Sequence, residues 1–343
     1  MLYERIIGVG GIGTGCVFSL IGDETLGRNE SRAAILEPMR DFCKLHIILH
    51  YACKLLGEKV PVTPIGLVGD DPTGHELIKN MADVGMDTRF VSFSEKPTMS
   101  AFCFLYPNGE GGNVIASNSA CEEVKEDYIR DSVGELDSTP EMVLVAPEIP
   151  FPSRLLMLEL ARKRGSYTVV SFTRAEAEQF SEYLGYIDLL ALNLEEARAL
   201  ANASDDQNPE DVVFKCYKKL CEKNPDARLI VTMGADGVYA CDMEIVLLPV
   251  PQVPVVSTAG AGDALLGGTM AALTCGLPFL CEGKPFSHIS GAVEIGILTA
   301  AIAVQSPDTI DFELDLKKMH ALAKQLCPVF SADASAFFGK GKE

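Results

Sequence analysis

The pattern of hydrophobic and polar positions changes near residue 128 of the chain. Beyond this point short apolar runs, among them MVLVAPEIP, YTVVSF and IDLLALN, alternate with helical periodicity over residues 153–164 and 176–184. Such alternation predicts parallel strands joined by crossover helices that cover both faces of a sheet. Three further strand-like runs follow, RLIVTM, GVYACD and EIVLLPV, and then a helix of small residues and two more helices. We therefore expect an α/β fold with a doubly wound, mostly parallel sheet flanked by helices.

The first part of the chain has a different pattern, because its β-type runs are short and are interrupted by polar turns. Two stretches of this type, about 13–40 and 92–118, predict a small β-sheet that forms a lid on the main domain. The segment between them contains an apolar helical face that ends at the stop signal Gly85. We expect residues 1–343 to form a single α/β domain with this lid inserted in it.

The composition restricts the class of protein and its partners. With 48% hydrophobic and 22% charged residues and no apolar run long enough for a membrane span, we expect a soluble protein without a membrane partner. The start, MLYERIIGVGG, lacks the regions of a signal peptide, which predicts a cytoplasmic location. The formal charge of -19 argues against nucleic acid as a partner, because such binding depends on neutralising phosphates. The eleven cysteines contain no CxxC pair, so reduced thiols are expected.

The strongest chemical signal is the run VVSTAGAGD, which ends at Asp263 and is followed by a helix-compatible segment. Gly260, Ala261 and Gly262 let the backbone turn sharply, so that successive N–H groups and a helix N-terminus converge on one point. Such a turn would bind an anion. Asp263 would lie within reach of the same point, where it could accept a proton from a hydroxyl that attacks phosphorus. From this motif alone, a simple helix cap is an equally good interpretation of Asp263.

Five segments in the same order resemble the ribokinase-like (PfkB) carbohydrate kinase family over nearly the whole chain. The GAGD signature stands at residues 260–263, and the N-x-x-E element matches NLEE at residues 193–196 after the strand DLLAL. VTMGADGVYA resembles the T-x-G-x-x-G strand and turn, and GLVGDDPTGHELIKNMADVGMDT the G-x-D-x-x-G helix segment. VLVAPEIP resembles the strand that ends in a Glu near the substrate. The resemblance implies a ribokinase-like fold and a kinase that moves the γ-phosphoryl group of ATP, with Mg2+, to a hydroxyl of a carbohydrate-like small molecule.

The resemblance also implies roles for individual residues. Asp263 would be the catalytic base, and the amides of Gly260, Ala261 and Gly262 would bind the γ-phosphoryl oxygens. A homodimer through the edge of the lid is a further implication, since several relatives form one. The remaining implied site residues are Asn193 and Glu196 for Mg2+ and its waters, Thr232, Gly234 and Gly237 for the nucleotide, and Glu148 for the substrate. A helix-capping Asn and a solvated Glu are the simpler interpretation of the N-x-x-E element taken alone.

The chain departs from the family at three places, one of which is the GGN-type turn before the helix ending at Gly57, replaced here by DFCKLH at residues 41–46. Family members usually carry Asp-Thr before the GAGD turn, where the Asp helps to form a monovalent-cation site; this chain has Ser257 there, which leaves potassium dependence in doubt. The early G-x-x-N-x-D element, whose Asp grips sugar hydroxyls, aligns with GGIGTG and ends at Gly15 without a carboxylate. A changed set of polar contacts changes the substrate, so ribose is not carried over. Candidates for the missing contacts are Asp23, Arg28, Asp41, Lys44 and Asn113, although a solvated surface is the more ordinary place for each of them.

Other interpretations remain beside the sugar kinase. A nucleoside kinase of the pseudouridine-like type fits the same motifs, and so does a non-catalytic nucleotide or sugar sensor, which would however have little need for Asp263. GVGGIG at residues 8–13 fits the dinucleotide fingerprint G-x-G-x-x-G, but the segment after it is polar and turn-like where a helix and a second strand are required. His46 and His50 have the spacing of some zinc sites, but HIILH lacks the adjacent Glu and fits a buried helical face better.

Overall fold

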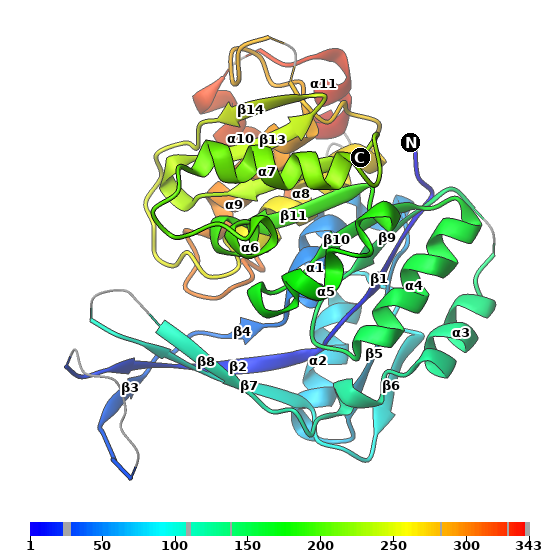
Figure 1. Cartoon of the computed structure of the whole chain (residues 1–343), viewed down its shortest axis with the longest axis vertical. Coiled ribbons are helices and arrows are strands. Elements are labelled where there is room, and N and C mark those ends of the chain that lie inside the picture. Colours follow the sequence, from blue (N-terminus) through cyan, green and yellow to red (C-terminus); the bar gives the residue numbers. More distant parts are fainter. Residues whose placement is uncertain (23–28, 108–110, 138, 282, 328, 340–343) are drawn as a thin grey trace.

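The chain forms two sheets, and the larger one lies at the centre of the main body of the molecule (Figure 1). The structure, a computed structural model, describes residues 1–22, 29–107, 111–137, 139–281, 283–327 and 329–339. The strands of the larger sheet are β1 (Arg5–Val9), β5 (Val62–Gly69), β6 (Phe90–Ser94), β9 (Glu141–Val145), β10 (Tyr167–Ser171), β11 (Leu189–Asn193), β12 (Arg228–Thr232), β13 (Val238–Asp242) and β14 (Glu244–Leu248). Their order is β14-β13-β12-β11-β10-β9-β1-β5-β6. All of these strands run in the same direction except β13, which is antiparallel to both β12 and β14. The predicted doubly wound, mostly parallel sheet is confirmed.

Helices cover both faces of this sheet, so each strand is buried on two sides (Figure 1). Ile6 and Ile7 in β1 show the principle, because these neighbours are both fully buried and point into different hydrophobic clusters. On the Ile6 side lie α1 (Lys44–Leu56), α2 (Pro72–Asp83), α8 (Ala261–Thr274), α9 (Ala292–Ala303), α10 (Leu316–Leu326) and α11 (Ala332–Gly339). On the Ile7 side lie α3 (Glu126–Gly134), α4 (Phe151–Arg164), α5 (Ala177–Phe180), α6 (Leu194–Ala201) and α7 (Pro209–Cys221).

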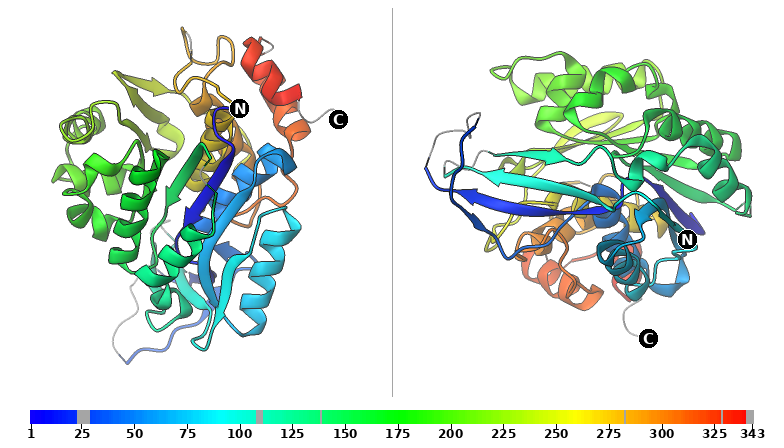
Figure 2. Two further views of the ribbon diagram at one scale, coloured as in Figure 1. Left: turned by 90° about the vertical axis from the view of Figure 1, so that its right-hand side faces the viewer. Right: turned by 90° about the horizontal axis from the view of Figure 1, so that it is seen from below.

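The second sheet projects from the body of the molecule, as expected for a lid (Figures 1 and 2). Its strands are β2 (Gly13–Leu20), β3 (Ala34–Leu36), β4 (Asp41–Phe42), β7 (Met99–Leu105) and β8 (Gly111–Ile115). They have the order β3-β2-β7-β8, and β4 pairs with β2. Residues 92–94 were expected in the lid but belong to β6 of the larger sheet, whereas β4 extends the first lid stretch to Phe42.

The chain passes between the two sheets through short, well-anchored connections. β1 continues directly into β2 without an intervening helix, which excludes the dinucleotide-binding unit considered for the glycine-rich start. Before β7, the carboxylate of Asp71 accepts hydrogen bonds from the N–H groups of Gly74 and Thr98, both at 2.8 Å. The Asp of the G-x-D-x-x-G segment therefore caps the start of α2 and also holds the backbone just before the lid strand β7.

Three expectations from composition and spacing can be compared directly with the structure. Within the described ranges, no helix combines the length and the hydropathy required to cross a membrane. All eleven cysteines lie in the described part of the chain and are free thiols. His46 and His50 lie on α1 and are at most 1% exposed, which confirms the buried helical face predicted for them.

Candidate active site

A cavity of about 660 Å³ lies at the carboxyl-terminal ends of β11 and β12, against the start of α8. Its size is that of a small-molecule site, and apolar side chains of the segment after β14 and of α9 form much of its wall. The sequence-predicted residues that line the cavity are Asn193, Glu196, Thr232, Gly234, Gly260, Ala261, Gly262, Asp263 and Lys44. Gly237 lies in the turn beside it, and Glu148, Asp41 and Asn113 are not part of its lining.

The glycine-rich turn before α8 is shaped by two constraints on Gly260. This residue is the N-cap of α8 and has φ 75°, a left-handed conformation that favours glycine. A Cβ at this position would also lie 2.7 Å from the carbonyl oxygen of Thr309. Asp263 is the third helical residue, and no side chain caps the helix, so the structure contradicts the interpretation of Asp263 as a cap. The first-turn amides are available to an anion, as at other helix N-termini.

One lysine joins the carboxylates at the bottom of the cavity. Lys44, the first residue of α1, places Nζ 3.5 Å from Oδ1 of Asp263 and 3.7 Å from Oε1 of Glu196. Burial raises the pKa of Asp263 and of Glu196, and the charge of Lys44 opposes this shift in both. Burial alone would lower the pKa of Lys44, but the surrounding carboxylates outweigh it and raise that pKa. The ammonium group therefore stays protonated and favours the ionised form of Asp263.

The N-x-x-E element forms the start of α6. The Asn193 side chain accepts a hydrogen bond from the N–H of Glu196, and Oε2 of Glu196 accepts one from the N–H of Asn193, both at 2.8 Å. This reciprocal capping box matches the simpler interpretation of the element. It also leaves Oε1 of Glu196 directed at Lys44 in the cavity, so capping and a site role are compatible.

In doubly wound folds, ligands bind in a crevice outside the carboxyl ends of the strands, at the point where the strand order reverses. This point lies beside β1, because the chain moves from β1 to β5 and β6 on one side and from β9 to β10 and β11 on the other. Gly11 follows β1 and donates its N–H to the carbonyl of Pro147 at 2.8 Å. A Cβ on Gly11 would lie 2.5 Å from the Cβ of Glu148, so only glycine fits against this residue.

Glu148 has the properties of a ligand-binding residue. Its φ of 77° is strained for a side chain other than glycine, and such strain concentrates at functional sites. Its Oε2 atom is buried and has no hydrogen-bond partner among the described residues. Burial raises the pKa of this carboxyl to about 7, although Cys43 and Lys44 act in the opposite direction. An unpartnered buried carboxylate oxygen is costly unless a ligand satisfies it.

The lid places a second carboxylate near Glu148, because the charge of Asp41 contributes to the raised pKa of Glu148. Asp41 in β4 pairs with Gly15 in β2, and a Cβ on Gly15 would lie 2.5 Å from Oδ2 of Asp41. The Cys103 thiol in β7 donates to the same oxygen at 3.6 Å, and Asn113 in β8 is the cross-strand partner of Cys103. Strand register therefore puts Asp41, Cys103 and the exposed Asn113 on one face of the lid. Asp23 and Arg28 lie outside the described residues.

Comparison with known proteins identifies the family. The family model described as "pfkB family carbohydrate kinase" matches residues 51–315. The chain belongs to the PfkB family. Among curated PfkB-like relatives, the ribokinase of Schizosaccharomyces pombe is 26% identical over 261 residues, which covers 75% of this chain and 80% of that protein. The adenosine kinase of Schizophyllum commune is 24% identical over 260 residues, with 70% and 72% covered.

A solved structure supports the fold independently of the sequence. The ribokinase of Cryptococcus neoformans var. grubii, in complex with ADP, matches with a TM-score of 0.74 at 20% identity, covering 93% of this chain and 99% of that one. The ribokinase-like fold expected from the resemblance is therefore confirmed, and the relatives of this PfkB protein include sugar and nucleoside kinases.

The geometry also explains the main departure from the PfkB pattern. Where the early family element ends in an Asp, this chain has Gly15, and the Asp41 carboxylate occupies the space beside its Cα. A carboxylate of the paired strand β4 thus lies beside Gly15. Sequence reasoning proposed Asp41 as one of several candidates for the missing substrate contacts. It missed Cys103 and Thr309, because their contacts join segments far apart in the chain. No local motif marks either residue.

Proposed function

We propose that this protein is an ATP-dependent phosphotransferase that moves the γ-phosphoryl group of ATP to a hydroxyl of a carbohydrate-like small molecule, with Asp263 as the base. One observation carries the proposal. Asp263 lies in the first turn of α8, directly after the glycine turn, in the lining of the cavity and in contact with Lys44. A base, an anion-binding turn and a cation thus meet at the point where the cavity approaches the acceptor crevice.

The residues of the chain divide the reaction between them. The acceptor oxygen forms a bond to the γ-phosphorus as its proton passes to Asp263, and the bond between that phosphorus and the departing ADP oxygen breaks. The amides of Gly260, Ala261 and Gly262 stabilise the charge on the phosphoryl oxygens. Lys44 opposes the rise in the pKa of Asp263 that burial causes, and it adds a positive charge beside the transferring group.

The cavity fits ATP with Mg2+. Its volume and its apolar wall suit a nucleoside, and Thr232, Gly234 and Gly237 lie in or beside the turn that borders it. Among the described residues, no group of three or more His, Cys, Asp or Glu could hold a metal ion by itself. Mg2+ typically binds through one or two carboxylates together with phosphate oxygens and waters, so Asn193 and Glu196 would hold it with the nucleotide. The ion would neutralise phosphate charge.

The crevice suits an acceptor with several hydroxyl groups. Asp41 and Glu148 offer carboxylate oxygens as hydrogen-bond acceptors, and Asn113 on the same lid face offers both a donor and an acceptor. A nucleoside acceptor is the second candidate, because the relatives include an adenosine kinase. The ribose hydroxyls of a nucleoside would make the same contacts.

Release of ADP from Mg-ATP across a panel of sugars, sugar acids, phosphosugars and nucleosides tests this function. Asp263→Asn should lower acceptor-dependent turnover by about 10²–10⁴-fold while ATP binding and folding stay close to wild type. Asp242→Asn is the control, because it breaks a partly exposed 2.9 Å ion pair with Arg228 away from the cavity lining. Comparable turnover in Asp263→Asn would remove the base from its role. Measurable ATP binding without turnover on any acceptor would favour a sensor.

The outer face of the lid supports a homodimer. This face is opposite to the one that carries Asp41 and Cys103, because successive side chains of a strand point to alternate faces. On it, the ring of Phe18 stacks on those of Phe102 and Phe104. Phe102 is 47% exposed and Val114, its cross-strand partner, is 61% exposed. An apolar sheet face of this kind is a suitable surface for a second copy of the chain. Light scattering should give a dimer for the wild type and a monomer for Phe102→Glu; a wild-type monomer would overturn this assignment.

A further inference from the structure

Thr309, in the loop after α9, holds the backbone on both sides of Asp41. Its hydroxyl accepts a hydrogen bond from the N–H of Phe42 at 3.1 Å. Its own N–H donates to the carbonyl of Arg40 at 3.1 Å, and the hydroxyl lies 3.4 Å from the same carbonyl oxygen. The side chain is 1% exposed, so water does not compete for these bonds. The residues before and after the lid carboxylate are therefore both fastened to one threonine.

The same threonine also packs closely against Gly260 in the glycine turn. Its carbonyl oxygen would lie 2.7 Å from a Cβ on Gly260, and its own Cβ would lie 3.0 Å away. The carbonyl of Val304, in the same loop, accepts hydrogen bonds from the N–H groups of Val256 at 2.7 Å and Ser257 at 3.2 Å. Loop 304–309 thus contacts the segment that leads to Asp263 at both of these points.

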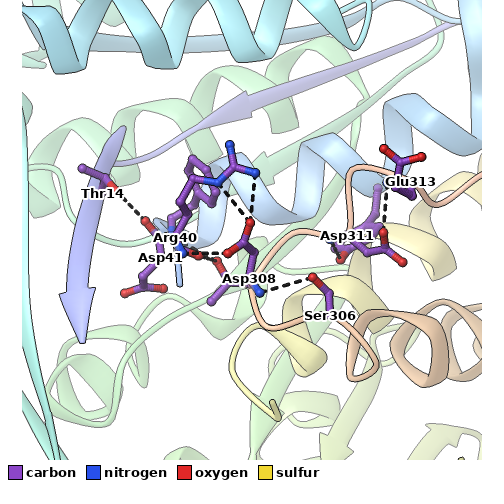
Figure 3. A network of polar contacts seen from close by, with 10 residues as sticks. Thr14, Arg40, Asp41, Ser306, Asp308, Asp311 and Glu313 are labelled. Carbon is purple, nitrogen blue, oxygen red and sulfur yellow. Dashed lines mark hydrogen bonds and ion pairs between the residues drawn. The ribbon is translucent and has the colours of Figure 1, made fainter. Parts of the chain in front are cut away.

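The hydrogen bonds around Asp41 extend this attachment to the lid (Figure 3). Arg40 donates from its backbone N–H to Oδ1 of Asp308 at 2.8 Å and from Nε to Oδ2 at 3.0 Å. On the other side, the hydroxyl of Thr14 in β2 donates to the carbonyl of Asp41 at 2.8 Å. Burial raises the pKa of the Asp41 carboxyl, and hydrogen bonding by Cys103, the Phe42 N–H and Thr309 opposes this rise. Figure 3 shows Arg40 and Asp41 between the lid strand and Asp308.

We infer that Thr309 is a positioning residue that fixes the acceptor carboxylate Asp41 relative to the turn containing Gly260 and Asp263. The inference rests on the proposed function, because it concerns the distance between the acceptor and the base. Asp41 and Gly260 lie more than two hundred positions apart in the chain, and Thr309 contacts the segments of both. A displacement of about 1 Å between reacting groups can cost on the order of 10²-fold in rate, so a single buried hydroxyl at this junction is sufficient to affect turnover.

The test removes the hydroxyl and keeps the shape. Thr309→Val should lower kcat/KM for the acceptor about tenfold or more, while the Kd for ATP changes less than about twofold, because the carbonyl of residue 309 still supports Gly260. Thr309→Ser retains the hydroxyl and should restore most of the loss. Thr168→Val is the matched control: its buried hydroxyl also both donates, to Tyr186, and accepts, from the N–H of Asp188, but lies at the start of β10. Equal losses in Thr309→Val and Thr168→Val would overturn the inference.

Two further measurements separate positioning from general stability. In an Asp41→Asn background, Thr309→Val should change kcat/KM less than about twofold, since residues that act through one another are non-additive. Full additivity would overturn the inference. Amide hydrogen exchange at Phe42 should speed up in Thr309→Val but not in Thr309→Ser, and this readout does not require turnover. Unchanged Phe42 exchange would disprove the link itself, whereas absent turnover in the wild type would count against the proposed function alone.

Discussion

Replacement of His46 should make the protein more resistant to acid. The ring of His46 is fully buried on α1, 4.9 Å from the ring of Phe42 and 6.4 Å from that of His50. Neither ring nitrogen of His46 has a hydrogen-bond partner in the part of the chain that the structure describes. Burial lowers the pKa of His46 from 6.5 to about 3, and it lowers the pKa of His50 in the same direction. The folded protein therefore keeps this ring neutral in mildly acidic solution.

The sign and size of the effect follow from the shift. Below pH 6.5 the unfolded chain binds a proton at His46 that the folded protein does not, so stability falls as the pH falls. Proton binding to His46 of the unfolded chain, integrated from pH 7 to pH 5, amounts to about 1.4 pH units. This lowers the free energy of unfolding by about 2 kcal/mol at this one site. His46→Leu removes this contribution and leaves the other titrating groups in place.

Urea unfolding followed by circular dichroism at pH 7 and pH 5 measures the difference, since the chain contains no tryptophan for fluorescence. The free energy of unfolding of the wild type should fall by about 2 kcal/mol more than that of His46→Leu over this interval. His75→Leu, at an exposed position on α2, serves as the control and should follow the wild type. An equal fall in wild type and His46→Leu would refute the reasoning.

Two further predictions concern the glycine turn and the lysine. Gly260→Ala places a side chain at φ 75° against Thr309 and should cost more stability than Gly276→Ala, which has φ 90° but open space around it. Backbone strain alone costs about 1–3 kcal/mol, so melting temperatures that fall equally in both variants would deny the steric contact. Lys44→Met should move the acid limb of the pH profile of kcat/KM to higher pH, because Lys44 lowers the pKa of Asp263. An unmoved limb would exclude this coupling.

The sequence predicted those parts of the molecule that depend on local patterns. Alternating strands and helices predicted the larger sheet, because a parallel strand buried on both faces is a nearly continuous apolar run, as in residues 142–145 of β9. The glycine turn and Asp263 were also found, since a left-handed N-cap such as Gly260 requires glycine and leaves a visible motif. The end of the lid stretch was less certain, because β4 is only two residues long and has no periodicity to read.

The acceptor crevice could be predicted only in part, because its geometry arises from contacts between distant segments. Gly15 was recognised as a lost carboxylate, but nothing near it in sequence shows that Asp41 fills the same space. Cys103 reaches Asp41 through the register of β2 and β7, which depends on how the lid strands pair. The same holds for Thr309, whose hydroxyl acts on residues 267 positions earlier in the chain.

The direct passage of β1 into β2 places the lid and the cavity in different parts of the chain. The cavity is lined mainly by residues from Ser171 onward, whereas the lid strands and Asp41 lie within about the first third of the chain. Lys44 is the one cavity-lining residue of that first third among the described residues. Under the proposed function, substitutions in the short lid strands can therefore change which acceptor binds without altering the residues that line the cavity.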